Sequence, residues 1–180
     1  MLAQQAEHVT HTVVDSPIGD LTLVAVDGAL AGLYMEQHRH RPAEETFGDP
    51  DPAAFDDVIA QLRAYFEGTL TQFDLPLSPR GTEFQRTVWA GLREIPYGQT
   101  ISYGGLADRL GRPGAARAVG LANGRNPISI IVPCHRVVGS SGDLTGYGGG
   151  LDRKRRLLAL EAARVPAAAG TGTGILPTLW

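Results

Sequence analysis

The first third of the chain alternates apolar and polar residues in a pattern that predicts a β-hairpin followed by a third strand. Two runs rich in β-branched residues, 9–14 and 21–26, are separated by the turn-forming residues 15–20. Asp27-Gly28 is a second turn signal, and an apolar run over 30–35 follows it. We therefore expect a small antiparallel sheet in this part of the chain.

A helix is predicted to follow a polar loop. Residues 36–51 are rich in His, Arg, Glu and Pro, which favours an exposed loop, and Asp51-Pro52 is a typical helix start. Apolar residues then recur at helical spacing, at Phe55, Val58, Ile59, Leu62 and Phe66. Residues 73–77 fit a further short strand. We assign this half of the chain a scaffold role.

The second half of the chain is predicted to be mostly helical. Thr82, with a glutamine three residues later, matches a capping box, and the apolar spacing after it places Trp89 in the core. Ser102 is suited to cap a short helix that Gly111 ends, and another short helix covers about 115–122. Two short helices joined by a brief Gly-containing turn outline a helix-turn-helix.

These patterns predict an α+β protein with two domains and a tail. Residues 1–79 form a sheet-and-helix domain, and residues 80–164, ending in a helix over 152–164, form a mainly helical one. The segment 165–180 is uncharged and offers little to pack, so we expect it to be mobile. Hydrophobic residues make up 43% of the 180 residues, which supports a proper core, but no apolar run is long enough for a membrane span.

Charge is divided unevenly between the two halves. Residues 1–79 carry 3 basic and 13 acidic side chains, whereas residues 80–164 carry 13 basic and 6 acidic side chains. The overall charge of −3 therefore conceals a second half with a charge of +7. Every basic residue except Lys154 is an arginine, which suits phosphate groups and stacking on bases. Such a division is expected where one half faces nucleic acid.

Cysteine and histidine usage limits the kinds of site available. Cys134 is the only cysteine, which excludes an internal disulfide and a zinc site with several thiolates and fits a reducing cytoplasm. Residues 1–7 lack the basic start and apolar core of a signal peptide. Four histidines are expected on the solvated surface rather than around a metal: His8, His11, His38 and His40.

The candidate chemistry centres on Pro133-Cys134-His135-Arg136-Val137. The apolar run 128–132 before it is expected to be a buried strand or extended segment. Cys134 is then either an inert core residue or, because a base and a cation adjoin it, a nucleophile. On a regular strand His135 would point to the opposite face, so either the backbone turns at Pro133 or a water carries the proton. The histidine also needs an orienting partner, normally a carboxylate.

This stretch resembles the active-site signature of the O6-alkylguanine-DNA alkyltransferases, also called methylated-DNA–protein-cysteine methyltransferases. The resemblance spans about residues 80–164. Its other segments are Gly-Gln-Thr-Ile-Ser-Tyr (98–103), Ala-Ala-Arg-Ala-Val-Gly (115–120), Asn126-Pro127, Gly-Tyr-Gly-Gly-Gly (146–150) and Leu-Leu-Ala-Leu-Glu (157–161). It implies a ribonuclease-H-like N-terminal domain and a winged helix-turn-helix-like C-terminal domain that enters the minor groove of double-stranded DNA.

The resemblance also implies direct-reversal DNA repair without a cofactor. A protein of this family flips O6-methylguanine, or another O6-alkylguanine, out of the duplex and transfers the alkyl group irreversibly to Cys134. His135 is implied as the base that takes the thiol proton through a water, and Glu161 as the residue that orients His135. Asn126 is implied as the hinge between the DNA-binding helix and the active-site segment. We expect a cytoplasmic monomer that can cluster cooperatively on DNA, away from membranes.

The same resemblance assigns residues to the base and the duplex. Arg117 fills the space left by the flipped nucleotide, and Tyr103 assists its rotation. Tyr147 forms a pocket wall, and Gly148 directs its N–H at O6. The carbonyls of Val137 and Cys134 face the exocyclic amine. We also place Lys154 among the substrate- and DNA-binding residues and expect it to support Glu161.

Two other functions are compatible with the residues alone. A cysteine hydrolase could use Cys134, His135 and Glu161 and would turn over without DNA. A non-catalytic helix-turn-helix damage sensor could resemble the alkyltransferase-like proteins, although those lack the cysteine.

Overall fold

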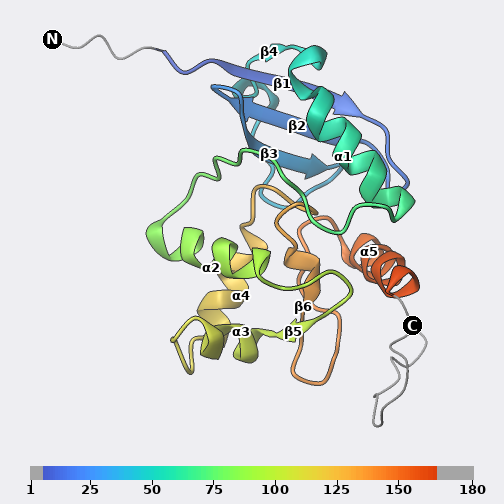
Figure 1. Cartoon of the computed structure of the whole chain (residues 1–180). Helices are drawn as coiled ribbons and strands as arrows, with labels where there is room; N and C mark the ends of the chain where they lie inside the picture. Colours follow the sequence, from blue (N-terminus) through green and yellow to red (C-terminus); the bar gives the residue numbers. More distant parts are fainter. Residues whose placement is uncertain (1–5, 166–180) are drawn as a thin grey trace, which may run out of the picture.

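A computed structural model describes residues 6–165, arranged as a sheet-and-helix half packed on a helical half (Figure 1). The tail predicted to be mobile lies, except for Val165, outside the described residues. No helix within residues 6–165 combines the length and the apolar character that a membrane span needs. The fold class expected from the sequence, α+β with a helical second half, is confirmed.

The N-terminal sheet contains the predicted hairpin. β1 (Val9–Val14) pairs antiparallel with β2 (Leu21–Val26), which pairs antiparallel with β3 (Ala29–Met35). The two-residue β4 (Asp49–Pro50) adds parallel to β1, which gives the order β3-β2-β1-β4. A 3-10 turn, η1 (Glu44–Thr46), interrupts the predicted loop.

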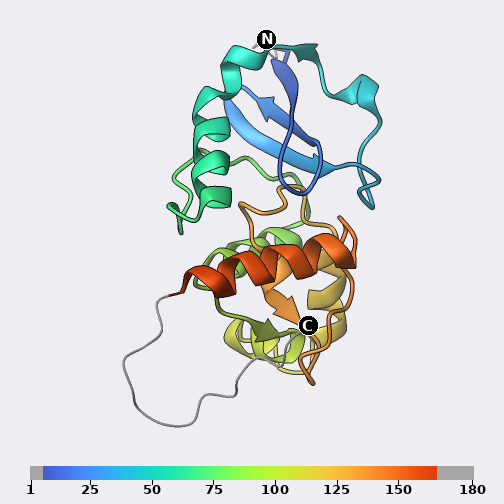
Figure 2. The same ribbon diagram turned by 90° about the vertical axis from the view of Figure 1, so that its right-hand side faces the viewer.

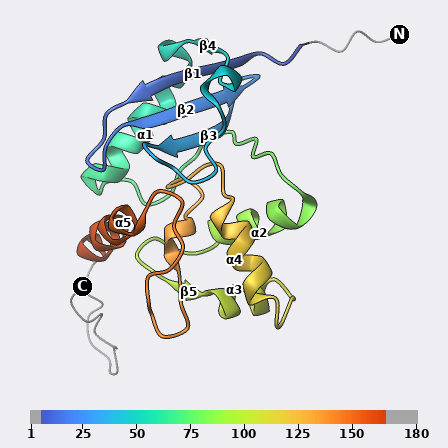
Figure 3. The ribbon, with the colours of Figure 1, turned by 180° about the vertical axis from the view of Figure 1, so that it is seen from behind.

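One helix covers a face of this sheet (Figures 1 and 3). A 3-10 turn, η2 (Pro52–Phe55), leads into α1 (Asp56–Glu67), which ends where Gly68 adopts the left-handed conformation. The prediction of a strand over residues 73–77 is wrong. That segment makes only an isolated bridge between Leu30 and Leu77, because it is a connecting segment between the two halves.

The C-terminal half is built on three short helices. α2 (Glu83–Arg93) begins with the predicted capping box, and Trp89 is buried, with its indole N–H donating to the Ala122 carbonyl at 2.9 Å. α3 (Tyr103–Arg109) is capped by the Ser102 hydroxyl, and α4 (Ala116–Gly124) follows after a turn. α3 and α4 form the predicted helix-turn-helix.

A small parallel sheet and the last helix complete this half. β5 (Ile101–Ser102) pairs with β6 (Val137–Val138), a pairing that the sequence did not predict. α5 (Leu151–Arg164) lies across the side of this half that faces the sheet domain (Figure 2). One hydrophobic cluster runs through both halves, from Leu21 of β2 to Leu157 of α5. The two halves therefore share a core.

The apolar run 128–132 is buried as predicted but is not a strand. Ile128 makes one bridge to Leu33, and the chain then turns, with Ile130 at a φ of 72°. This conformation is costly for a β-branched residue. Asn126 holds the turn, since its side-chain amide donates to the Val132 carbonyl at 2.8 Å and accepts from the Ile128 N–H at 3.0 Å.

Candidate active site

Cys134 lies on a short 3-10 helix rather than on a strand. The chain turns after Pro133, and η3 (Cys134–Arg136) follows, with all three of its side chains buried. The turn removes the geometric conflict expected for a regular strand, in which neighbouring side chains diverge. The thiol is therefore held at a bend between the Asn126-braced turn and β6.

His135 and Glu161 form a buried pair. His135 Nε2 lies 2.7 Å from Glu161 Oε1, and both side chains are fully buried. Because the carboxylate can only accept, Nε2 carries the proton toward Glu161 and Nδ1 is the free basic nitrogen. Nδ1 is buried and has no hydrogen-bond partner among the described residues. This arrangement leaves a lone pair available to take a proton.

The charge states of this pair follow from burial and hydrogen bonding. Burial lowers the pKa of His135 although Glu161 opposes the shift, so the imidazole is neutral at rest. Burial alone would raise the pKa of Glu161, but hydrogen bonds and charge from His135 and Arg136 outweigh it and hold that pKa well below its usual range. The pair therefore rests as a neutral base next to a carboxylate.

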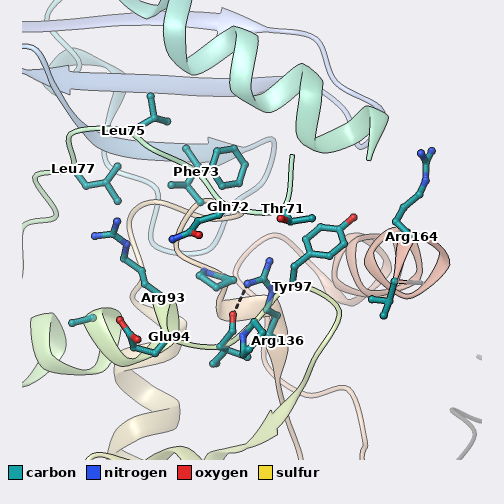
Figure 4. Close-up of a pocket in the computed structure, with 16 residues that line it drawn as sticks. Thr71, Gln72, Phe73, Leu75, Leu77, Arg93, Glu94, Tyr97, Arg136 and Arg164 are labelled. Atoms are coloured by element: carbon teal, nitrogen blue, oxygen red, sulfur yellow. Dashed lines mark hydrogen bonds between the residues drawn. The ribbon is translucent and has the colours of Figure 1, made fainter. Parts of the chain in front are cut away.

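Arg136 neutralises Glu161 from the other side. Its Nε donates to Glu161 Oε2 and its Nη2 donates to Oε1, both at 2.9 Å, and its Nη1 donates to the Ile95 carbonyl at 2.6 Å (dashed line in Figure 4). The guanidinium also lies over the Tyr97 ring, 5.7 Å from the centroid. A cavity of about 770 Å³ opens beside Arg136 and Tyr97. Cys134 does not line it, so this cavity is not the place where the thiol reacts.

Two further groups reach Glu161 and were not identified from the sequence. The Tyr65 hydroxyl of α1 donates to Oε1 at 2.7 Å, and the Gly98 N–H donates to Oε2 at 3.1 Å. Tyr65 is fully buried, and 96 residues separate it from Glu161 in the chain. In the sequence, Tyr65 is distinguished only by its position on the apolar face of a predicted helix. That position predicts packing in the core and not a hydrogen bond to Glu161. The carboxylate thus receives hydrogen bonds from both halves of the protein.

Cys134 is a thiol at rest. Burial raises its pKa, and the opposing effects of Asn126, Lys154 and Ser129 are smaller. The cation adjoining it in sequence, Arg136, is bound to Glu161 and does not lower the pKa of the thiol as the sequence suggested. Activation therefore requires removal of the proton by a nearby base.

Lys154 has a different role from the predicted one. Its Nζ donates to the Val137 carbonyl at 2.6 Å and to the Thr145 carbonyl at 2.9 Å, rather than to Glu161. Burial lowers its pKa from 10.5 to about 8. Because the ammonium binds two loop carbonyls, Lys154 fixes the segment that follows Cys134. It also supplies positive charge near the thiol.

Tyr147 and Tyr103 lie near the thiol. The negative charge of an ionised Cys134 contributes, after burial, to raising the pKa of both phenols, so both hydroxyls remain protonated donors. The Tyr103 hydroxyl donates to the Thr145 carbonyl at 3.0 Å. Gly120 of α4 lies against the Tyr103 ring, where an added Cβ would be 3.5 Å away. Tyr103 therefore connects the helix-turn-helix to the active site.

The loop at Gly148 is braced by the N-terminal half. The Arg39 N–H donates to the Gly148 carbonyl at 2.8 Å, and a Cβ at Gly148 would lie 2.7 Å from His38 Nε2. A serine at Gly148 would therefore require His38 to move. The prediction that His38 is solvated is wrong: it is buried between this loop and Tyr34, and its Nδ1 accepts from the Met35 N–H. Of the other histidines predicted to be solvated, His8 and His40 are exposed and His11 is half-buried.

Arg117 is separate from this buried group. It is exposed on α4, between small residues, and a second exposed side chain, Leu121, follows one turn later with 71% of its surface accessible. Ala118 is exposed as well. An arginine among alanines leaves the helix free to approach another surface closely. The structure thus brings the predicted catalytic residues together and leaves Arg117 available to an external partner.

Comparisons with known proteins agree across nearly the whole chain. Residues 9–79 match the ribonuclease-like domain of 6-O-methylguanine DNA methyltransferase, and residues 83–163 match its DNA-binding domain. The methylated-DNA–protein-cysteine methyltransferase of Mycobacterium bovis is 57% identical over 159 residues, which cover 88% of this chain and 96% of that protein. The protein of the same name from Methanosarcina acetivorans is 46% identical, covering 85% of this chain and 98% of its own.

Solved structures give the same result. The crystal structure of Mycobacterium tuberculosis OGT in complex with DNA superposes with a TM-score of 0.83 at 57% identity, covering 87% of this chain and 95% of that chain. The crystal structure of the M. tuberculosis O6-methylguanine methyltransferase superposes with a TM-score of 0.81 at 58% identity, covering 88% of this chain and 96% of that one.

Proposed function

Because the chain belongs to the 6-O-methylguanine DNA methyltransferase family and acts in DNA repair by alkyl transfer, we propose that Cys134 accepts the alkyl group from O6-alkylguanine. DNA is a partner of this chain. Neither the cysteine hydrolase nor the non-catalytic damage sensor agrees with relatives named as methyltransferases at 57% identity.

The transfer is a displacement at the saturated alkyl carbon. His135 Nδ1 takes the thiol proton through a bridging water, and the Cys134 sulfur attacks the carbon attached to O6. The S–C bond forms as the C–O6 bond breaks, and the electron pair leaves with the guanine. The guanine anion then takes a proton at N1 from water, and the imidazolium of His135 releases its proton to water, so the number of protons balances. A thioether has no good leaving group, so each molecule reacts once.

The duplex must release the base before the thiol can reach it. Cys134 is only 3% exposed, and a paired base cannot enter such a site without leaving the stack. α4 approaches the minor groove with its alanine-rich face, and Arg117 occupies the space that the base leaves. Tyr103 and Tyr147 receive the base, and the Gly148 N–H and the carbonyls of the 134–137 segment recognise its edge.

One observation carries this proposal, namely the buried array in which Glu161 fixes His135 next to the lone cysteine. The test is the intact mass of the protein after mixing with a duplex that contains O6-methylguanine. We expect a stoichiometric gain of one methyl group, which peptide mapping locates on Cys134, and no turnover beyond one equivalent. An unmodified thiol beside an unrepaired duplex would overturn the proposal.

The finer properties of the complex are part of the same proposal. We expect the chain to act as a cytoplasmic monomer that is specific for alkylated guanine and that binds neighbouring sites on DNA cooperatively. Sedimentation of the free chain tests whether it is a monomer. Titration of long and short duplexes tests cooperativity, since only the longer ones can hold adjacent molecules.

A further inference from the structure

The hydroxyl of Tyr65 and the imidazole of His135 share one oxygen atom of Glu161. Both donors lie 2.7 Å from Oε1, and all three side chains are fully buried. Tyr65 comes from α1 of the N-terminal half, whereas η3 and α5 belong to the C-terminal half. A residue of the scaffold half is thus linked through a single carboxylate oxygen to the base that the proposed reaction uses.

From this geometry we propose that Tyr65 is a positioning residue for alkyl transfer, which acts through Glu161 to hold His135 ready to take the thiol proton. The inference deepens the proposed function and rests on it, because it requires that Cys134, His135 and Glu161 carry the reaction. Tyr65 touches neither Cys134 nor DNA, so its effect is indirect.

Core packing explains the ring of Tyr65 but not its hydroxyl. The ring contacts Phe66, Phe73 and Tyr97, with centroid separations of 5.3, 5.4 and 6.0 Å. A phenylalanine would make the same contacts. The hydroxyl instead points to a carboxylate, and burial together with the charge of Glu161 raises the pKa of Tyr65 well above its usual value. The group is therefore a permanent donor at every pH at which the protein works.

A permanent donor on Oε1 limits how strongly Glu161 attracts a proton on His135. Hydrogen bonds to the charged form of a carboxylate stabilise it and weaken its pull on a neighbouring cation. Without the Tyr65 hydroxyl, imidazolium is favoured and the pKa of His135 rises toward neutrality. The base is then protonated over a wider pH range and cannot accept the thiol proton there.

Several other ionisable groups surround His135. Those that face it, directly or through Glu161, are Cys134 and Arg136 of η3, Lys154 and Glu161 of α5, Tyr65 of α1, Tyr97 between α2 and β5, and Tyr147 between β6 and α5. Tyr97 offers a matched control. It adjoins the same cluster and its hydroxyl is buried, but that hydroxyl has no hydrogen-bond partner among the described residues.

The experiment compares Tyr65→Phe and Tyr97→Phe with the wild type in the full chain. Single-turnover methyl transfer is measured from pH 5.5 to 9, roughly spanning the ordinary pKa of histidine and of a thiol, with both methylated duplex and free O6-methylguanine. For Tyr65→Phe we expect the acid limb of the rate profile to move up by about half to one pH unit on both substrates, the size set by one hydrogen bond. Tyr97→Phe should leave the acid limb in place.

NMR titration of ring-labelled histidine gives a readout that a packing defect would not move. The His135 resonance should titrate at higher pH in Tyr65→Phe than in the wild type. An unchanged acid limb and an unchanged His135 titration in a folded Tyr65→Phe variant overturn the inference, as does an equal shift in Tyr97→Phe. A wild type that acquires no methyl group refutes the proposed function itself, so the two failures are distinguishable.

Discussion

Glu161→Gln is expected to destabilise the fold more than an ordinary change of charge. The carboxylate receives five hydrogen bonds, from His135, Tyr65, Gly98 and two nitrogens of Arg136. A glutamine can keep its oxygen at the Oε1 position, but its amide group then faces the Gly98 N–H and Arg136 Nε, which are both donors. At least two buried donors lose their acceptor, and one of them belongs to a buried cation.

The size of the effect follows from the burial of the ion pair. Arg136 is only 6% exposed and Glu161 is fully buried, so water can compensate little of the charge left on the guanidinium. Breaking a buried pair by removing one partner costs about 3–5 kcal/mol. For a chain of this size that corresponds to a fall in Tm of roughly 6–20 °C. The shared core makes the loss visible in a single unfolding transition.

Urea unfolding followed by the fluorescence of buried Trp89 measures this free energy. Glu36→Gln is the matched control, since Glu36 is 65% exposed and lies 3.9 Å from Arg153, and such pairs contribute at most about 1 kcal/mol. Adding Arg136→Met to Glu161→Gln should recover part of the loss, because it removes the unpaired charge. A Glu161→Gln loss no larger than that of Glu36→Gln would refute the reasoning.

Three further outcomes follow from the site and the fold. Cys134→Ala should abolish the gain of a methyl group yet keep the affinity for duplex, as measured by fluorescence anisotropy; residual transfer would place the acceptor elsewhere. Arg117→Ala should slow repair of duplex by roughly tenfold or more, because the alanine cannot fill the space of the flipped base and so cannot offset an unstacking cost of a few kcal/mol. It should leave the rate with free O6-methylguanine unchanged, and an equal loss on both substrates would contradict the role of Arg117. Burial, followed by the charges of Arg153, His40 and Arg41, lowers the pKa of His38 from 6.5 to about 4. The unfolded chain therefore binds a proton at His38 below pH 6.5, whereas the native protein binds it only below about pH 4. Stability should therefore fall by about 3 kcal/mol as the pH falls through this window, and His38→Asn should flatten that dependence in urea unfolding curves.

Local signals in the sequence predicted most of the elements. The hairpin of β1 and β2, the capping box at Thr82 and the Ser102 cap are each set by residues within one turn or one pair of strands. The run 128–132 was interpreted wrongly because apolar content reports burial and not conformation. Tertiary hydrogen bonds from Asn126 impose a turn there, even at a β-branched residue.

The candidate site was predictable only as far as the resemblance reached. It led to Cys134, His135 and Glu161, which the fold brings together. The hydrogen-bond partners of Glu161 could not be predicted in this way. Tyr65 is 96 residues away along the chain, Gly98 is 63 and Arg136 is 25, and no regular spacing relates them to Glu161. The burial of His38 was missed for the same reason, because Gly148, which lies against its ring, belongs to the other half of the chain.

The shared core limits how this protein can be divided. The two matched family domains, residues 9–79 and 83–163, meet near residue 80. A fragment that begins there would carry the thiol but lack α1. It would leave the shared hydrophobic cluster incomplete and would lose the phenol that bonds Glu161. The two halves are therefore not independent units, and a minimal repair reagent should keep both of them.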